Sequence, residues 1–526
     1  MTPEEWIAHD PDPATAAELA ACDPDELAER FARPLMFGTA GLRGPVRGGP
    51  DAMNVAVVSR ATWAVAQVLI ARGLHRSSVI VGRDARHGSA VFATVTAEVL
   101  AAQEFSVLLL PGSVPTPVLA FAVRHTGAAA GIQITASHNP PADNGYKVYL
   151  DGGIQIVSPT DREIEAAMAG APPADQIDRA PVEPAQTDLV KRYIERAAGL
   201  RRGIGSVRVA LTALHGVGGA VAVETLHRAG FVEVHSVATQ FAPDPDFPTV
   251  AFPNPEEPGA ADALLDLAAD VGADVAIALD PDADRCAVGV KDGPRWRMLS
   301  GDETGWLLGD YLLSMTQADK PVVASTVVSS RMLSAIAARY GAVHVETLTG
   351  FKWLARADAK VPGGTLIYAY EEAIGHCVDP AAVRDKDGIS AAVLVCDLVA
   401  TAMRQGRSVR NLLDDLARRY GVHDVAAVSR RVADATEAAG LMRRWRADPP
   451  KTLAGYAATL TDITDALIFT AGDEDTSIRL VVRPSGTEPK LKCYLEIRAA
   501  VYDDLDSSRR RAGALREALI AAVRSW

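Results

Sequence analysis

A serine and a histidine at the end of an apolar strand pattern are the residues of this sequence best suited to chemistry. The pattern at 132–136 ends abruptly at Ser137, His138, Asn139 and Pro140. Because proline stops regular structure, the sequence predicts a strand-to-loop corner with the Ser137 hydroxyl displayed rather than packed. A serine in such a turn most often bonds only its own backbone, but two further segments favour a chemical role here.

Three carboxylates at alternate positions form the first of these segments. Asp280, Asp282 and Asp284 directly follow an apolar strand pattern. Mg²⁺ prefers oxygen ligands, and a loop can fold side chains at alternate positions around one ion. The triplet therefore predicts a magnesium site rather than a solvated acidic loop. An EF-hand calcium loop would need glycine and glutamate where this chain has Arg285 and Lys291.

An aspartyl-phosphate enzyme is a second interpretation of the same loop. In such enzymes the first carboxylate after a strand is the nucleophile and a metal screens the phosphate, so Asp280 would carry the phosphoryl group. This interpretation leaves Ser137 and its neighbours without a role, and we therefore rank it second.

A segment near the C-terminus has the composition of a phosphate site. Arg483, Ser485, Gly486 and Thr487 follow a strand pattern at 478–482. A guanidinium, two hydroxyls and a concave turn of backbone N–H groups can surround a phosphate dianion, although a simple Pro/Gly turn has a similar composition. The chain has no GxxxxGK[ST] sequence, so a nucleoside triphosphate is not implied.

Further charged residues could complete a site for a sugar phosphate. Arg43 lies in a glycine-rich segment, where the backbone can approach a ligand and the cation can neutralise a phosphoryl oxygen. Glu371 and Glu372 could bind vicinal sugar hydroxyls, although a surface charge pair has the same pattern. Other candidates close to strand patterns or before a helix are Lys147, Thr349, Gly350, Lys352 and Lys386.

Strand-like and helical patterns alternate over most of the chain. Strand patterns occur at 78–82, 107–110, 207–211, 275–279 and 321–328, with a helical pattern at 89–102. This alternation predicts α/β units with mixed or parallel sheets and ligand sites at the carboxyl ends of strands. We expect three α/β domains and a smaller C-terminal α+β domain. The predicted limits are 1–200, with N-terminal helices and the Ser137 loop; 201–318, with the acidic loop; 319–424, with the Glu371 loop; and 425–526, with the Arg483 loop.

Composition sets the broad class of the protein. The chain has 526 residues, of which 48% are hydrophobic and 23% charged, which is typical of a modular globular protein without a long disordered tail. Its net charge of -13 argues against nucleic acid or anionic membrane as a general partner. Five cysteines without CxxC spacing, an acidic N-terminus without a secretory pattern and no apolar run of membrane-spanning length predict a cytoplasmic protein.

Taken together, TASHNP, DPDADR, EEAIG and RPSGTEPK resemble the motifs of the phosphoglucomutase/phosphomannomutase family, the α-D-phosphohexomutases, over essentially the whole chain. FGTAGLRG, DNGYKVY and TGFKW resemble the branch of type-two phosphoglucomutases and phosphopentomutases. The resemblance implies a four-domain, heart-shaped α/β enzyme in which each domain supplies one loop to a central cleft. It also implies a mutase that moves a phosphoryl group between C1 and C6, or C5, of an aldose phosphate, through a phosphoserine and a bisphosphorylated intermediate.

The same resemblance implies a role for each candidate residue. Ser137 would be the phosphoserine and would bind one Mg²⁺ together with Asp280, Asp282 and Asp284, and a sugar bisphosphate would act as activator. Residues near the reacting phosphoryl group would be Arg43, His138, Lys147 and Lys386. The substrate would be bound by Arg285, Thr349, Gly350, Lys352, Glu371, Arg483, Ser485, Gly486 and Thr487.

Two departures from the family pattern leave the sugar and the proton-transfer group open. Ala373 stands where many hexose mutases have serine, so one hydroxyl contact is absent and a pentose phosphate is admitted. Phe351 stands where related bacterial enzymes have histidine, which leaves Lys147, His138 or Lys386 for proton transfer. Glucose or mannose phosphate is the first expectation, in a monomer or homodimer. A phosphopentomutase, a sugar bisphosphate synthase and a catalytically silent sugar-phosphate sensor are the alternatives.

Overall fold

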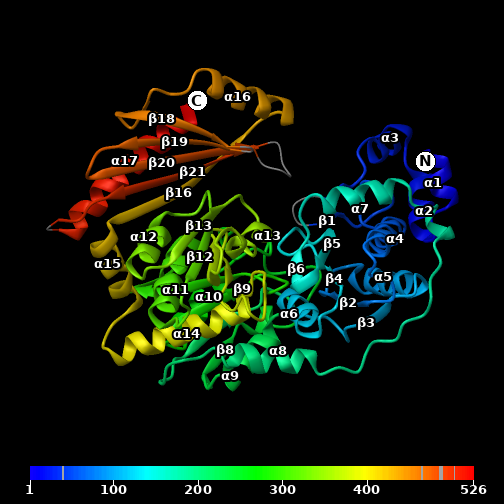
Figure 1. Ribbon diagram of the computed structural model, residues 1–526, viewed down its shortest axis with the longest axis horizontal. Helices are drawn as coiled ribbons and strands as arrows, with labels where there is room; N and C mark the ends of the chain where they lie inside the picture. Colours follow the sequence, from blue (N-terminus) through cyan, green and yellow to red (C-terminus); the bar gives the residue numbers. More distant parts are fainter. Residues whose placement is uncertain (38–40, 464–465, 485–489, 503, 526) are drawn as a thin grey trace.

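The computed structural model describes residues 1–37, 41–463, 466–484, 490–502 and 504–525. Within these residues, four β-sheets follow one another along the chain, each with its own helices (Figure 1). We call each sheet with its helices a unit, numbered in chain order. The expected architecture, three mixed α/β sheets followed by a smaller α+β part, is confirmed. The domain limits stay predictions, and the last sheet begins at Val422, slightly before residue 425.

The first unit is a mixed sheet with helices on both faces. Its elements are α1 (Pro3–Ala8), α2 (Pro13–Ala21), α3 (Pro24–Ala32), β1 (Leu42–Pro45), α4 (Val55–Ala71), β2 (Ser78–Arg83), α5 (Ser89–Ala102), β3 (Ser106–Leu109), α6 (Thr116–Thr126), β4 (Ala130–Ile134), β5 (Asp143–Leu150), β6 (Ile154–Gln155) and α7 (Thr160–Ala169). The strand order is β1-β5-β4-β2-β3, with β6 beside β5. Val79 and Val81 pack in one apolar cluster with α4 and α5, whereas Ile80 packs in another with α6. Side chains alternate along a strand, so the two clusters lie on opposite faces.

The second unit has a parallel half and an antiparallel half. Its elements are α8 (Leu189–Ala198), β7 (Val209–Thr212), α9 (Gly219–Arg228), β8 (Val234–Ser236), α10 (Asp262–Asp270), β9 (Val275–Leu279), β10 (Cys286–Asp292) and β11 (Arg295–Met298). The order is β11-β10-β9-β7-β8. β7 is parallel to β8 and β9, and β10 is antiparallel to β9 and β11.

The third unit shares its core with the second. Its elements are α11 (Gly301–Met315), β12 (Pro321–Thr326), α12 (Met332–Arg339), β13 (Val343–Thr347), α13 (Phe351–Leu354), β14 (Thr365–Glu371), β15 (Gly375–Cys377), α14 (Gly388–Arg404) and α15 (Val409–Tyr420). The sheet order is β13-β12-β14-β15, with β15 antiparallel to β14. α14 is buried along most of its length and joins one apolar cluster with residues of both units. This shared core ties the two units together.

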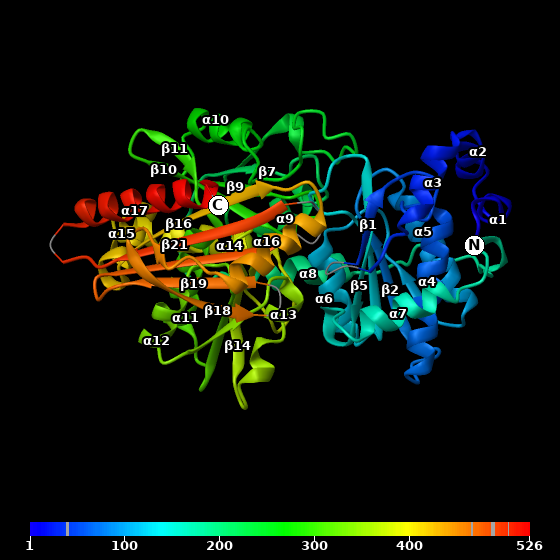
Figure 2. The ribbon, with the colours of Figure 1, turned by 90° about the horizontal axis from the view of Figure 1, so that it is seen from above.

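The fourth unit is an antiparallel sheet that lies against the third unit and carries α17 (Figures 1 and 2). Its elements are β16 (Val422–Arg431), α16 (Ala435–Ala447), β17 (Thr452–Leu453), β18 (Tyr456–Ile463), β19 (Ala466–Gly472), β20 (Thr476–Pro484), β21 (Lys490–Ala499) and α17 (Leu505–Ser525). The order is β16-β21-β20-β19-β18-β17. In both views the first unit lies to one side of the second and third.

Four strands, one in each unit, end at the segments singled out in the sequence. β4 ends just before Ser137, β9 before Asp280, β14 at Glu371 and β20 just after Arg483. Strand ends of this kind are the usual place for ligand sites in α/β proteins.

No single helix among the described residues is long and apolar enough to cross a membrane. Helices α14 and α15 would satisfy the length and composition only if counted together across the sharp bend between them.

Candidate active site

The turn after β4 presents Ser137 to the second unit. Ser137 has a φ of 54°, a left-handed conformation that is uncommon for residues with a Cβ and that clusters at functional sites. Its backbone N–H donates to Thr135 Oγ1 at 2.9 Å. Its Oγ donates to Asp280 Oδ2 at 3.0 Å and lies 3.2 Å from His138 Nδ1. The structure thus brings the serine together with the first residue of the acidic loop.

Arg86 holds this turn, and sequence reasoning missed it. Its guanidinium donates to the carbonyl oxygens of Ser137 at 2.6 Å, Asn139 at 2.7 Å and Pro140 at 2.8 Å. The same group lies 4.9 Å from the ring centroid of Phe247, which belongs to the second unit. A rigid fork of donors can fix several carbonyls at once. The sequence feature that could have identified Arg86 is a basic residue shortly after β2, because strand β2 lies beside β4 in the sheet.

The structure corrects the expectation that the Ser137 hydroxyl is displayed. Ser137 is only 2% exposed. Within the first unit alone, a strand-to-loop corner would face solvent. In the whole protein, the acidic loop of the second unit packs against the first unit. The N–H of Thr116 donates to Asp282 O at 2.9 Å, and Thr116 Oγ1 donates to Asp282 Oδ2 at 2.6 Å. The hydroxyl is therefore shielded from solvent and held beside the acidic loop.

Asp280, Asp282 and Asp284, which we call the acid triad, form a compact cluster after β9. All three are 0% exposed, and one carboxylate oxygen from each lies within 4.8 Å of the others. Among the described residues, Oδ1 of Asp282 and Oδ1 of Asp284 have no hydrogen-bond partner. Buried carboxylate oxygens without donors are costly, and a hard divalent cation would satisfy them. The residues present therefore fit Mg²⁺.

Burial and neighbouring charges govern the ionisation of the acid triad. Burial, followed by the charges of Asp282 and Asp284, raises the pKa of Asp280 well above its usual range. Burial also acts to raise the pKa of Asp282, but the Lys147 ammonium and the hydrogen bonds from Lys147 and Thr116 outweigh it, so this pKa is lowered. The pKa of Asp284 is lowered as well, because nearby cations outweigh burial and the charge of Asp282. Carboxylates this close together need cations around them.

Two lysines from different units supply such cations. Lys147, on β5, is buried, and its Nζ donates to Asp282 Oδ2 at 2.6 Å and to Asp284 Oδ2 at 2.9 Å. Lys386, just before α14, is also buried, and its Nζ lies 3.3 Å from Asp284 Oδ2. Burial acts to lower the pKa of both ammonium groups, but the aspartates outweigh it and raise each pKa. Both lysines therefore stay charged.

His138 and Arg43 complete the surroundings of Ser137. Burial, followed by the charges of Arg285 and Arg43, lowers the pKa of His138 well below its usual range. The imidazole is therefore neutral near pH 7. Arg43, on β1, donates from Nη1 to Asn139 Oδ1 at 3.3 Å. Burial lowers the pKa of Arg43, but a guanidinium remains charged. The site thus combines a neutral base next to Ser137 with several cations.

Arg285 joins the acid triad to the Glu371 loop. Its backbone N–H donates to Asp280 Oδ1 at 3.0 Å, and its Nη2 lies 3.7 Å from Glu371 Oε1. Its backbone also forms an isolated antiparallel bridge with Gly375. A Cβ at Gly375 would lie 2.5 Å from Lys386 Cδ and 2.9 Å from Glu371 Cγ. Glycine at this position leaves room for both of these side chains beside the strand.

Three other predicted site residues make no such contacts with the described residues around Ser137 and the acid triad. Within the described part of the chain, Thr349, Gly350 and Lys352 make no hydrogen bond or ion pair with the residues named above. Their neighbour Phe351 does reach the cluster, since Lys386 Nζ lies 5.4 Å from the centroid of its ring. Phe351 therefore packs on a cation instead of offering a titratable group.

The predicted phosphate loop begins at the end of β20. Arg483 lies on β20 opposite Lys492 of β21. Ser485, Gly486 and Thr487 lie outside the described residues, so their position relative to the other site residues stays a prediction.

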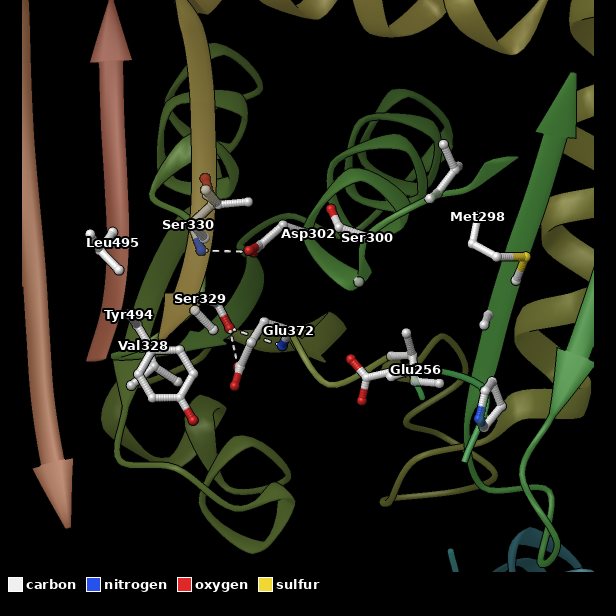
Figure 3. A pocket seen from close by; sticks show the side chains of 18 of the residues that line it. Glu256, Met298, Ser300, Asp302, Val328, Ser329, Ser330, Glu372, Tyr494 and Leu495 are labelled. Carbon is white, nitrogen blue, oxygen red and sulfur yellow. Dashed lines mark hydrogen bonds between the residues drawn. The ribbon is translucent and has the colours of Figure 1, made fainter. Parts of the chain in front are cut away.

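A cavity of about 570 Å³ adjoins the site, between the fourth sheet and the second and third units (Figure 3). Glu256 and Glu372 both line it. Glu372 Oε2 accepts a hydrogen bond from Ser329 Oγ at 3.1 Å, and Tyr494 of β21 lies on the cavity wall. Glu256 Oε2 lies 3.9 Å from Arg285 Nη1. Desolvation raises the pKa of Glu256 to about 7, with Arg285 opposing the shift and Glu372 adding to it. Sequence reasoning missed Glu256, because it lies in a Pro-rich segment without a strand or helix pattern.

Three family models match the chain in succession. They describe the alpha/beta/alpha domains I, II and III of phosphoglucomutase/phosphomannomutase and match residues 34–173, 191–293 and 300–420. The chain belongs to this family. Within it, the Ser137 turn falls in the first matched domain, the acid triad in the second and Glu371 in the third.

Relatives in the family align over most of the chain. A probable phosphomannomutase of Haemophilus influenzae is 41% identical over 86% of this chain and 95% of its own length. A probable phosphoribomutase of Schizosaccharomyces pombe is 34% identical over 95% of this chain and 94% of its own length. The phosphopentomutase of Homo sapiens is 32% identical, covering 94% and 90%. The family makes this chain a phosphosugar mutase of the isomerase class, and the names of its relatives do not select one sugar.

Solved structures of the family share the fold. A phosphoglucomutase/phosphomannomutase family protein of Burkholderia thailandensis has a TM-score of 0.72 at 22% identity, covering 93% of this chain and 97% of that one. Parafusin, a phosphoglucomutase of Paramecium in its open form, has a TM-score of 0.70 at 19% identity, covering 92% and 95%.

Proposed function

We propose that the protein moves a phosphoryl group between C1 and C6, or C1 and C5, of an aldose phosphate. Ser137 carries the phosphoryl group between transfers, and a bisphosphorylated sugar is the intermediate. One observation carries this proposal: Ser137 Oγ lies 3.0 Å from Asp280 Oδ2, at the edge of the buried acid triad. A hydroxyl beside carboxylates that fit a divalent cation suits phosphoryl transfer to and from a side chain.

The surroundings of Ser137 suit a phosphoserine that must outlast each turnover. Because Ser137 is only 2% exposed, water is kept from competing for the phosphoryl group. Lys147, Lys386 and Arg43 place positive charge around the site, which offsets the charge of the phosphoryl oxygens. When bound, Mg²⁺ would be held by the acid triad and would supply further charge stabilisation.

His138 is suited to hold the proton of the Ser137 hydroxyl. Its Nδ1 lies 3.2 Å from Ser137 Oγ, and its lowered pKa keeps the ring neutral. The imidazole can accept the proton once the hydroxyl turns from Asp280 Oδ2 toward Nδ1, as Oγ attacks phosphorus, and can return it when the phosphoryl group leaves. Lys147 contacts two aspartates and stays charged, so it serves as a cation rather than as a base.

The remaining predicted residues bind the parts of the substrate that do not react. Glu371, next to Arg285, binds sugar hydroxyls, and the loop that begins at Arg483 holds the distal phosphate. Remote binding of this kind aligns the reacting end. A sugar bisphosphate loads Ser137 at the start, and the enzyme acts in the cytoplasm as a monomer or homodimer, without a nucleic acid or membrane partner.

Mass measurement of the intact protein tests the phosphoserine. After incubation with glucose 1,6-bisphosphate, the wild type should gain the mass of one phosphate, whereas Ser137→Ala should gain none and lose turnover. Ser158→Ala, a change at an exposed serine of the same unit, is the matched control and should keep both properties. Turnover in Ser137→Ala would refute the proposal. A phosphate that hydroxylamine releases would instead indicate an acyl phosphate on Asp280.

Glucose or mannose phosphate is the first substrate class that we propose, and a pentose phosphate is the second. The second is supported by Ala373, which offers a methyl group where a hydroxyl could bind the sugar, and by relatives named for ribose and pentose. Values of kcat/KM for glucose 1-phosphate, mannose 1-phosphate and ribose 1-phosphate, measured side by side, decide between them. A clear preference for ribose 1-phosphate would overturn the hexose assignment, and release of a sugar bisphosphate as the main product would indicate a synthase.

A further inference from the structure

Strand β5 carries two buried polar side chains on the face that meets the other units. Lys147 and Tyr149 are two residues apart, so they point to the same side of the sheet. Lys147 contacts the acid triad, whereas the function proposed above gives Tyr149 no role. Tyr149 is nevertheless 0% exposed, and its hydroxyl is directed at a carboxylate of another unit.

That carboxylate is Asp385, which directly precedes Lys386. The Tyr149 hydroxyl donates to Asp385 Oδ2 at 2.7 Å, and Gln155 Nε2 donates to the same oxygen, also at 2.7 Å. The other oxygen, Oδ1, accepts the backbone N–H of Lys386 at 2.8 Å and lies 3.5 Å from Lys386 Nζ. Both oxygens of this buried carboxylate are thus engaged, one by the first unit and one by Lys386.

The contacts continue from Asp385 into the acid triad. Lys386 Nζ, held on one side by Asp385, lies 3.3 Å from Asp284 Oδ2. Burial, followed by the charge of Asp385, raises the pKa of Tyr149 well above its usual range, so the hydroxyl remains a donor. A buried carboxylate is costly unless its oxygens accept hydrogen bonds, so these donors determine where Asp385 is stable. The position of Asp385 in turn limits where Lys386 can lie.

We propose that Tyr149 is a positioning residue: through Asp385 it holds Lys386 against Asp284, while Lys147 reaches the acid triad from the same strand. One strand of the first unit thereby sets the position of both lysines, one by direct contact and one through Asp385. This inference rests on the proposed function, because Lys386 is taken to stabilise the phosphoryl group. It adds a residue whose hydroxyl hydrogen-bonds Asp385 and Gln155 rather than the acid triad or Ser137.

A second tyrosine on β5 provides a matched control. Tyr146 is also 0% exposed, and its hydroxyl lies 2.9 Å from Thr62 Oγ1 inside the first unit, on the opposite face of the strand. Tyr149→Phe and Tyr146→Phe each remove one buried hydroxyl and keep the ring. We expect the two variants to lower the melting temperature by similar amounts. Only Tyr149→Phe should lower kcat, by about 10- to 100-fold as for other groups that orient an active-site residue, with KM changed by less than about twofold.

A double-mutant cycle with Lys386→Met tests whether Tyr149 acts through Lys386. If it does, Tyr149→Phe should reduce kcat strongly in the wild type and hardly at all once Lys386 is replaced. Equal kcat values for Tyr149→Phe and Tyr146→Phe, or full additivity with Lys386→Met, would overturn the inference.

Hydrogen exchange separates a failure of this inference from a failure of the proposed function. If the wild type does not interconvert sugar phosphates, the proposed function is wrong, but the contact can still be examined. The Lys386 amide bonds Asp385, so exchange in segment 384–387 should be faster in Tyr149→Phe than in Tyr146→Phe. Identical exchange in the two variants would show that Tyr149 does not position this segment.

Discussion

The side chains around Ser137 take their ionisation states from one another. His138 is a neutral base because burial and neighbouring cations disfavour its charged form. Lys147 stays charged in the same region because two aspartates accept its hydrogen bonds. An imidazole beside the Ser137 hydroxyl and an ammonium beside the carboxylates are therefore suited to different tasks, proton transfer and charge stabilisation.

Metal dependence is the first prediction at this site. Excess chelator should abolish turnover, because the buried oxygens of the acid triad would lose their cation. Asp282→Asn should lower the affinity for Mg²⁺ by at least about tenfold. Replacing residues that only contact a metal ligand already costs about that much in other metal sites, and Asp282 would bind the ion itself. Turnover measured as a function of Mg²⁺ concentration reports both effects.

The control for this prediction is Asp270→Asn, which changes an exposed carboxylate in the same unit and should leave the Mg²⁺ dependence unchanged. Undiminished rates in excess chelator would contradict the metal assignment.

Strand β5 shows how one element serves both the core and the site. Tyr146 and Val148 pack in the apolar cluster of the first unit, whereas Lys147 and Tyr149 face the other units. The neighbouring strand β1 comes close to the backbone of β5 where β1 begins. There, Gly41 lies next to the backbone of Tyr146. The pairing of β1 with β5 in turn carries Arg43 to the Ser137 turn.

Gly41→Ala tests how tightly β1 must approach β5. Gly41 has a φ of 84°, and a Cβ there would lie 2.0 Å from Tyr146 O. Gly73 has a similar φ of 75° with nothing within 4 Å of its Cβ position, so Gly73→Ala isolates the conformational cost of about 1 to 2 kcal/mol. Gly41→Ala should cost about 1 to 3 kcal/mol more, because the backbone of β5 has to move.

Urea denaturation measures the free energy of unfolding of both glycine variants, and kcat should fall only in Gly41→Ala because Arg43 shifts with β1. Equal free energies for the two variants would show that the close approach is not required.

Across the whole molecule, a buried carboxylate fastens the fourth unit to the third. Glu496, on β21, accepts hydrogen bonds from Ser330 Oγ at 2.6 Å and from Arg331 N at 2.9 Å, and lies 2.8 Å from His423 Nδ1. Burial acts to raise the pKa of Glu496, but His423 and Arg331 outweigh it and lower this pKa. The predicted phosphate loop follows β20 of the same sheet, so this attachment also fixes where that loop begins.

Glu496→Gln should therefore destabilise the protein in a pH-dependent way. Removing the charge of a buried, paired carboxylate costs about 3 kcal/mol near pH 7. The pKa of Glu496 is below its ordinary value of 4.5 in the folded protein, so its contribution is fully present above 4.5 and is lost as the pH falls toward the folded value. The difference in unfolding free energy between wild type and variant should thus be smaller at about pH 4 than at about pH 7.

Asp462→Asn, which breaks an exposed ion pair with Arg446 in the same unit, should cost less than about 1 kcal/mol at either pH. A Glu496→Gln effect that does not change with pH would show that the charge of Glu496 does not support the attachment.

Packing between units also explains where a strand prediction failed. The apolar pattern at 321–328 predicts a strand to its end, but β12 stops at Thr326. Val327 and Val328 instead pack against Ile468 and Val481 of the fourth sheet. An apolar residue satisfies the same pattern whether it lies in a strand or under a neighbouring sheet, so the sequence pattern does not distinguish the two cases.

The amino-acid sequence by itself determined the local features of this protein. It identified the helix at 89–102, the strands that end before Ser137 and Asp280, and the residue types suited to phosphate and metal, because each depends on neighbours in the chain. Only the tertiary structure decided that Ser137 is buried beside Asp280 and that Tyr149 bonds Asp385. These partners come from different units, and their distances depend on how the sheets pack, which no local pattern records.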